Sequence, residues 1–232
     1  MAAYVRMTAL DIVNEVRRRL GVNTVTLFDS DKHARVLLQL LNEVIAEVND
    51  YGDWQELYQE VLVTASTSVP EYSVRASGGK EVHHILEVAF NDNAGELQNR
   101  SIEEIRRLRR AGGVGTPRQF TIKGTDASGN PVLAVHPQPG TSQNNQTFNV
   151  ALYTKEPLLV ATTAQTTTVP VFPGNLLVLG LYAKGMLEEN GGEPTRQYQM
   201  AFAEYQKFLR EAVNRFTTDT GSSIRIIPNR RG

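Results

Sequence analysis

Residues 194–216, PTRQYQMAFAEYQKFLREAVNRF, show the clearest helical pattern in the chain. Their apolar residues recur every three or four positions, which places them on one face of an α-helix. That face carries an aromatic stripe of Tyr198, Phe202, Tyr205, Phe208 and Phe216. Such a stripe can hold a cofactor, but burial in a core is the stronger interpretation. The helix therefore needs apolar partners elsewhere in the chain.

The segment before it, residues 176–187, is the first of these partners. It follows Pro173, a residue that is favoured in a first helical turn, and two glycines at 191–192 end it. The segment is apolar enough to be a buried helix. Gly180 and Ala183 on its apolar face would allow another helix to approach closely.

The N-terminal part of the chain supplies two more helices. Residues 8–20 begin with Thr8 and Asp11, which form a capping-box pattern, and a glycine ends the segment. Residues 29–51 have apolar residues at helical spacing and also end at a glycine. We therefore predict one helical bundle built from both ends of the chain.

The middle of the chain, residues 57–171, changes to short segments rich in β-branched and aromatic residues. Clusters of Gly, Asn, Asp and Ser separate these segments, as is typical of antiparallel strands. A helix interrupts them at residues 101–110, where Ser101 and Glu104 form another capping box. The predicted strands are residues 57–64, 71–75, 84–90, 119–123, 132–136 and 147–153.

These patterns predict an α+β fold with three parts. Residues 1–56 and 172–216 form the helical bundle, and residues 57–171 form an inserted antiparallel β-rich barrel or sandwich. Residues 217–232 form an extended C-terminal tail. Because the two halves of the bundle are distant in sequence, the β region is one excursion from a shared core.

The composition excludes several classes of protein. The chain has 232 residues and a formal net charge of -1, so it is no general polycationic binder of nucleic acid. It contains no cysteine, which excludes disulfides and cysteine zinc sites. The most apolar stretch is too short to span a bilayer, and the first residues do not resemble a signal peptide. We expect a soluble protein, made in the cytosol, with no membrane partner.

No combination of residues in the sequence points to catalysis. The histidines His33, His83, His84 and His136 lack the spacing of zinc motifs. Strand neighbours point to opposite faces, so His83 and His84 are not expected to chelate a metal together. The glycines at 112–115 match neither a P-loop nor a dinucleotide-binding motif. We predict no catalytic residue, no metal and no cofactor.

The first candidate interaction segment is basic. Residues 100–110, RSIEEIRRLRR, contain Arg100, Arg106, Arg107, Arg109 and Arg110. Guanidinium groups suit phosphate oxygens, so non-specific contact with nucleic acid is one interpretation. The arginines could instead pair with Glu103 and Glu104, or with acidic groups of another subunit. No aromatic residue is interleaved for base stacking, which favours a solvated or inter-subunit face.

The second candidate is the C-terminal tail. After a polar spacer it reads Ile224-Arg225-Ile226-Ile227, followed by Pro228 and by Arg230 and Arg231. A segment this short cannot bury its own isoleucines. We therefore predict that a surface outside the domain receives it. The tail could add a strand to a sheet edge or fill a groove, with the proline ending the pairing.

The order of several short motifs resembles a known family. The motifs are LLNEVIAEV at 40–48 with Asp53-Trp54, GTPRQFTI at 115–122, LAVHPQP at 133–139, residues 148–153 with Pro157-Leu158, and Val169-Pro170. In this order they resemble the head-to-tail adaptor proteins of short-tailed bacteriophages. That group includes tail tubular protein A and the tail accessory factors. The resemblance covers about residues 8–216.

The resemblance implies a structural role in the virion. Such adaptors assemble as a ring, usually a dodecamer, beneath the portal protein at the capsid vertex. The ring continues the DNA channel, where non-specific contact with genomic DNA is one option, and it is the platform for the tail nozzle protein. The C-terminal extensions dock on the portal. The expected portal-docking residues are then Ile224, Arg225, Ile226, Ile227, Arg230 and Arg231.

The resemblance also implies where the protein is found, which is the head-tail junction of the virion after assembly in the host cytoplasm. A different class of function stays open beside it. The β region could be a surface- or carbohydrate-binding module of a tail or capsid decoration protein. An enzyme such as a glycosidase is disfavoured, because no catalytic combination of residues is found.

Overall fold

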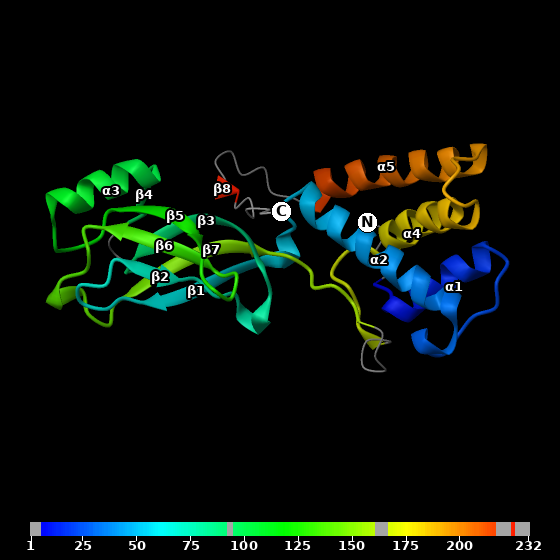
Figure 1. Cartoon of the computed structure of the whole chain (residues 1–232), viewed down its shortest axis with the longest axis horizontal. Helices are drawn as coiled ribbons and strands as arrows, with labels where there is room; N and C mark the ends of the chain where they lie inside the picture. The colour runs from blue at the N-terminus through cyan, green and yellow to red at the C-terminus, as the bar shows by residue number, and fades with distance from the viewer. Residues whose placement is uncertain (1–5, 92–94, 161–166, 217–223, 226–232) are drawn as a thin grey trace. The chain divides into compact units, whose positions relative to one another are not determined.

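The computed structural model describes residues 6–91, 95–160, 167–216 and 224–225 (Figure 1). The chain divides into two compact units, one from Met1–Glu56 and Glu156–Thr218, the other from Leu57–Lys155 and Asp219–Gly232. Helices make up most of the first unit and strands most of the second, which confirms the predicted α+β class. We call them the helical unit and the β unit.

The helical unit is arranged around one apolar helix. Helix α4, Gly174–Glu189, contacts α1, Ala9–Arg19, as well as α2, Lys32–Tyr51, and α5, Arg196–Phe216. Because neighbours cover α4 on several sides, its buried residues are spread around the helix, whereas the other three helices are amphipathic. The bundle predicted from both ends of the chain is present.

Helices α2 and α5 approach α4 closely at Gly180. A Cβ atom at this position would lie 2.7 Å from Val44 Cγ1 of α2 and 2.8 Å from Tyr205 Cε2 of α5. Both distances are shorter than non-bonded carbon atoms allow. The absence of a side chain at Gly180 therefore sets the spacing of three helices, as the sequence predicted.

Polar contacts fix the N-terminal helices. Thr8 Oγ1 accepts a hydrogen bond of 3.1 Å from the Asp11 N–H and so caps α1, as predicted. Helix α2 begins two to three residues later than predicted, because Phe28–Ser30 form a short 3-10 helix, η1. Asp31 caps α2, and its Oδ2 also forms an ion pair with Nη2 of Arg17 at 2.6 Å. The Arg17 side chain is 3% exposed. The buried arginine thus joins α1 to the start of α2.

Two asparagines of α2 hold the segment that follows the last long strand. Asn49 Nδ2 donates to Glu156 O at 3.1 Å, and Asn49 Oδ1 accepts from Glu156 N at 2.8 Å. Asn42 pairs in the same way with the backbone of Leu159, at 2.8 Å for both bonds. Residues 156–160 therefore belong to the helical unit, which corrects the predicted β-region boundary of 57–171.

The β unit contains two four-stranded sheets. Their strand orders are β1-β7-β3-β8 and β2-β6-β5-β4. All six predicted strands are present, with ends that shift by one to two residues. The strands are β1, Tyr58–Thr64; β2, Glu71–Ser73; β3, Val82–Phe90; β4, Gln98–Asn99; β5, Gln119–Thr125; β6, Pro131–His136; β7, Thr147–Thr154; and β8, Ile224–Arg225.

The two sheets share one core, so the β unit is a sandwich. Phe148 of β7 lies 4.8 Å from the ring of Phe90 on β3 and 5.0 Å from the ring of Tyr72 on β2, which belongs to the other sheet. Leu133 and Val135 of β6 belong to the same buried cluster. Inward-facing residues of both sheets therefore pack together, as in sandwiches generally.

One strand pair departs from the antiparallel prediction. Strand β4 pairs with β5 in parallel, with Gln98 opposite Gln119. Helix α3, Ile102–Ala111, lies between these strands in the chain. A parallel pair needs such a crossover connection, so the predicted helix at 101–110 explains the exception.

Three further 3-10 helices complete the described elements: η2, Gln55–Leu57; η3, Ser77–Gly79; and η4, Thr141–Gln143. Among the helices of the described residues, none combines the length and apolar character needed to cross a membrane.

Candidate functional site

Helix α3, which carries most of the predicted basic segment, packs against β5 and β6 of the sandwich (Figure 1). Ser101 caps it, with Ser101 Oγ accepting a 3.2 Å hydrogen bond from the Glu104 N–H. Ile105 is the buried residue of α3. Acidic residues stand in the first turn and arginines in the last, which suits the helix dipole.

Arg109 is turned toward the sheet and holds α3 in place. Its Nη1 donates to Glu71 Oε1 at 2.8 Å, and its Nη2 donates to Pro70 O at 2.6 Å and Val135 O at 3.3 Å. Lys123 Nζ reaches the same carboxylate at 2.9 Å. Because its guanidinium is used inside the β unit, Arg109 is a structural residue and a poor candidate for contact with a partner.

The carboxylate at the centre of this cluster is Glu71. Burial by itself would raise the pKa of Glu71, but hydrogen bonds from Lys123 and Arg109 outweigh burial and hold the pKa below its ordinary value of 4.5. Beside it, a cavity of about 180 Å³ lies between α3 and the sheet. Arg106 also lines that cavity, so cations outnumber carboxylates there.

Replacing Glu71 with glutamine is expected to lower the free energy of unfolding by about 1–2 kcal/mol at pH 7. The value reflects lost charged hydrogen bonds at a site about one third exposed. Because the folded pKa of Glu71 is lowered, its contribution is complete above pH 4.5 and is lost as pH falls through the folded value. Urea unfolding measures the difference. Glu96→Gln, at an exposed position, is the control, and equal losses in both variants would contradict the assignment.

Arg100 also has partners within the β unit. Its Nη2 donates to Gln98 Oε1 at 2.9 Å, and its Nη1 lies 3.6 Å from Glu104 Oε1. This i,i+4 pair is one of those considered from the sequence. Arg100 is half-buried and contributes to the turn into α3.

The remaining arginines of the segment, Arg106, Arg107 and Arg110, are exposed. Within the described part of the chain, none of the three has a carboxylate within ion-pair distance. Sequence reasoning missed Arg118, which is also exposed and belongs to the motif at 115–122. The five predicted arginines therefore separate into two internal residues and three that form a free basic face, which we call the α3 face.

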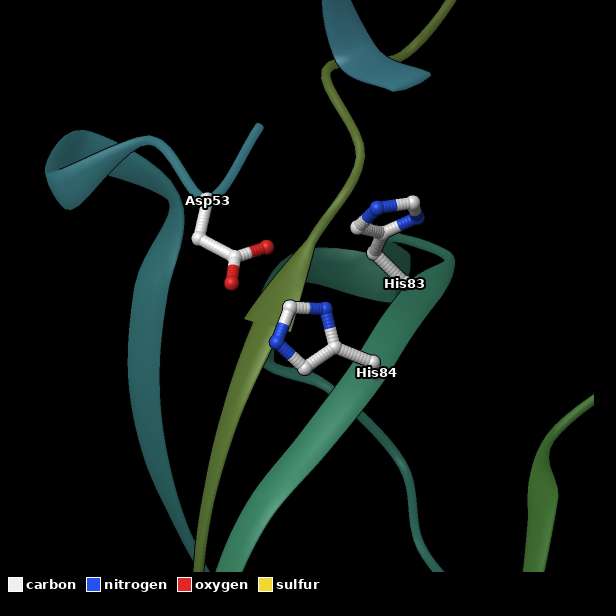
Figure 2. A group of neighbouring side chains, drawn as sticks. All are labelled: Asp53, His83 and His84. Carbon is white, nitrogen blue, oxygen red and sulfur yellow. The ribbon is translucent and has the colours of Figure 1, made fainter. Parts of the chain in front are cut away.

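His83 and His84 lie next to each other at the start of β3 (Figure 2). Their ring centroids are 5.2 Å apart, so the expectation that they point to opposite faces is wrong. The pairing of β3 with β7 shifts register between Val82 and His84, and such a bulge interrupts the alternation of side chains.

The tail contributes one described element, β8. Its backbone pairs antiparallel with β3, placing Arg225 opposite His84 and Ile224 opposite Ile85. The predicted docking residues Ile226, Ile227, Arg230 and Arg231 lie outside the described residues. The expected strand character of the tail is thus present at Ile224 and Arg225, on a sheet edge of the same chain.

A family model named SU10 adaptor protein matches residues 7–227, which is nearly the whole chain. The chain belongs to the SU10 adaptor protein family. No curated protein matches it. The match covers the helical unit, the sandwich and β8.

Membership of the SU10 adaptor family makes this chain a structural adaptor protein of a bacteriophage. It is a component of the virion and interacts with other head and tail components. The match supports the adaptor class that the motif order indicated, but it does not single out tail tubular protein A. The family is structural and generally non-enzymatic.

Proposed function

We propose that this SU10 adaptor is a head-to-tail connector. Its copies form a ring beneath the portal, dodecameric in the simplest case, which extends the DNA channel and provides the attachment platform for the tail nozzle. The observation that carries the proposal is the family match, because it spans both units and the tail strand.

The distribution of charge supports contacts between unlike faces of neighbouring copies. Acidic residues outnumber basic ones by four in the helical unit, within 1–56 and 156–218. Basic residues outnumber acidic ones by one within 57–155, and residues 219–232 hold three arginines against one aspartate. A ring closes through heterologous contacts, and complementary charge orients such contacts.

The direct test mixes the purified protein with portal rings of the same phage. We expect the adaptor to sediment with the portal in a fixed ratio, and electron microscopy to show an added ring on one face of the portal. The nozzle protein should bind to that complex and not to the portal alone. If the adaptor stays unbound at micromolar concentrations of both proteins, the connector proposal is wrong.

The α3 face is proposed to contact either a neighbouring subunit or genomic DNA. Changing Arg106, Arg107 and Arg110 together to glutamate should weaken that contact by roughly tenfold or more, since each surface pair contributes up to about 1 kcal/mol. Ring assembly on portals measures the first alternative, and DNA retention in filled particles measures the second.

The matched control changes the same three residues to lysine, which keeps the charge. Arg109 stays unchanged in both variants, because it holds α3 to the sheet. If the α3 face binds DNA, DNA retention should also fall as the salt concentration rises, as expected for phosphate contacts. If the glutamate variant assembles and retains DNA like the lysine variant, the α3 face is only a solvated surface.

A further inference from the structure

The outer edge of β3 is covered at both of its ends by other parts of the β unit. Strand β7 takes one side of β3 along its length. On the other side, β8 pairs at His84 and Ile85, while Leu97 N donates to Val88 O at 2.8 Å and Glu96 bridges to Ala89. Because residues 96–97 cover the edge at Val88 and Ala89, an added strand can pair only along the short stretch at His84 and Ile85, where β8 lies. We call this stretch the β3 slot.

The pairing that fills the β3 slot is minimal. Two residues of β8 face two residues of β3, and the sheet register of β3 shifts immediately beyond, between Ile85 and Glu87. Pairings this short are marginal on their own in water. The strand in the slot is therefore held weakly enough to be exchanged.

The segment that enters the slot lies far along the chain from β3. Helix α5 of the helical unit ends at Phe216, and seven residues, TTDTGSS, stand between it and Ile224. These seven residues include no large apolar side chain. Every copy of the chain has the same slot and the same segment, so a strand from another copy would make the same backbone hydrogen bonds.

We propose that the β3 slot binds the Ile224–Arg225 strand of a second copy of this chain. Such an exchange of an identical element costs little, because the hydrogen bonds that break within one chain form again between two chains. Effective concentration then decides which copy's strand fills the slot. Crowding of copies in an assembly favours exchange, which links neighbouring subunits through their sheets. The proposal goes beyond the connector function and does not require a portal.

The absence of cysteine allows a clean cross-linking test with the full chain. Cα atoms of directly opposed residues in an antiparallel pair lie about 4.5–5.5 Å apart, within the range of a disulfide. One preparation carries His84→Cys and another carries Arg225→Cys, and they are mixed at equal concentration under mild oxidation. A disulfide between His84→Cys and Arg225→Cys can then form only between two chains.

We expect the mixed dimer to be at least about tenfold more abundant than with a control pair, in which Ala203→Cys on the exposed face of α5 replaces His84→Cys. Mass spectrometry with one chain isotopically labelled identifies the linked positions. A variant with both substitutions in one chain reports pairing within the chain. If that variant cross-links while the mixture gives only the control level, the strand does not exchange, and the proposal fails.

A second measurement leaves His84 unchanged. Protein lacking residues 217–232 has an empty slot, and a synthetic peptide of residues 219–230 is titrated into it. We expect saturable binding that is lost when the peptide carries Arg225→Pro, because proline removes the N–H needed for pairing. If both peptides bound equally, or if neither bound at millimolar concentration, the proposal that the β3 slot accepts a separate strand would be wrong. Neither result depends on whether the adaptor binds portals.

Discussion

Replacing Gly180 with leucine is expected to prevent the helical unit from folding. Even a single methyl group at this position meets Val44 at 2.7 Å and Tyr205 at 2.8 Å, and both are buried side chains. Overpacking of a filled core costs about 1–3 kcal/mol for small additions. A leucine adds three more heavy atoms between α2, α4 and α5, so the loss should exceed that range.

Gly180→Ala provides the graded version of this experiment. Alanine favours a helix over glycine by about 1 kcal/mol, so a surface substitution of this kind stabilises. At Gly180 we expect a net loss of about 1–2 kcal/mol, because the clash outweighs that gain. Circular dichroism in urea measures it.

The matched control is Gly185→Ala in the same helix. A Cβ atom there would lie 3.3 Å from the ends of two flexible side chains, Leu20 and Leu37, and 3.9 Å from Val16 Cγ1, which is an ordinary contact. The gain in helix propensity should then survive, leaving stability close to that of the wild type. If Gly180→Ala were as stable as Gly185→Ala, the close approach of the helices at Gly180 would not limit the fold.

The helices could be predicted from the sequence because their signals are local. Thr8 and Ser101 cap their helices through contacts three residues away, and glycines follow the ends of α2 and α4. The uniform apolar character of α4 likewise indicates its central position. These features need no knowledge of distant parts of the chain.

The errors in the predicted fold come from long-range pairing. Asn42 and Asn49 bind backbone groups 117 and 107 residues away, so no local pattern places residues 156–160 beside α2. Strand β4 has two residues and exists only through its pairing with β5. The bulge at Val82 and His84, which brings two histidines together, depends on the register of β7.

The sequence predicted the basic segment of α3 but did not separate its inward-facing arginine from its exposed ones. Helical geometry explains that separation. Arg109 follows Ile105 by four positions and therefore shares its inward face, whereas Arg107 and Arg110 are exposed. Arg106 is exposed as well, although it also lines the cavity beside Glu71. This division could have been read from the sequence. The occupation of the β3 edge by β8 could not, because nothing local pairs Ile224 with Ile85.

Deleting residues 217–232 is expected to weaken binding of the adaptor to portal rings by at least about a hundredfold. We propose that each copy of the connector docks its C-terminal tail on the portal, as the resemblance to head-to-tail adaptors implies. Burial of two or three isoleucines gives roughly 4–8 kcal/mol per tail, and ordering of about eight residues offsets much of it. One tail therefore binds weakly, and many tails on one ring bind strongly, by factors of about 10² to 10⁴.

The truncated protein should keep its fold, which makes the result interpretable. Among the described residues, those that form the two cores all come before 217, and β8 adds two paired residues to one sheet. Urea unfolding of the truncated and full-length proteins should therefore agree within about 0.5 kcal/mol. A matched variant, Ile226→Asp with Ile227→Asp, leaves Ile224 and Arg225 intact and removes apolar anchors alone.

Mixed rings provide the sharpest form of the experiment. When truncated and full-length copies are combined at increasing ratios, affinity for the portal should fall steeply with the fraction of truncated copies, because each missing tail removes one of several cooperating contacts. A shallow, linear fall would mean that the tails act independently or not at all. Unchanged portal binding by the fully truncated protein would place the portal contact elsewhere, on the helical unit or the sandwich.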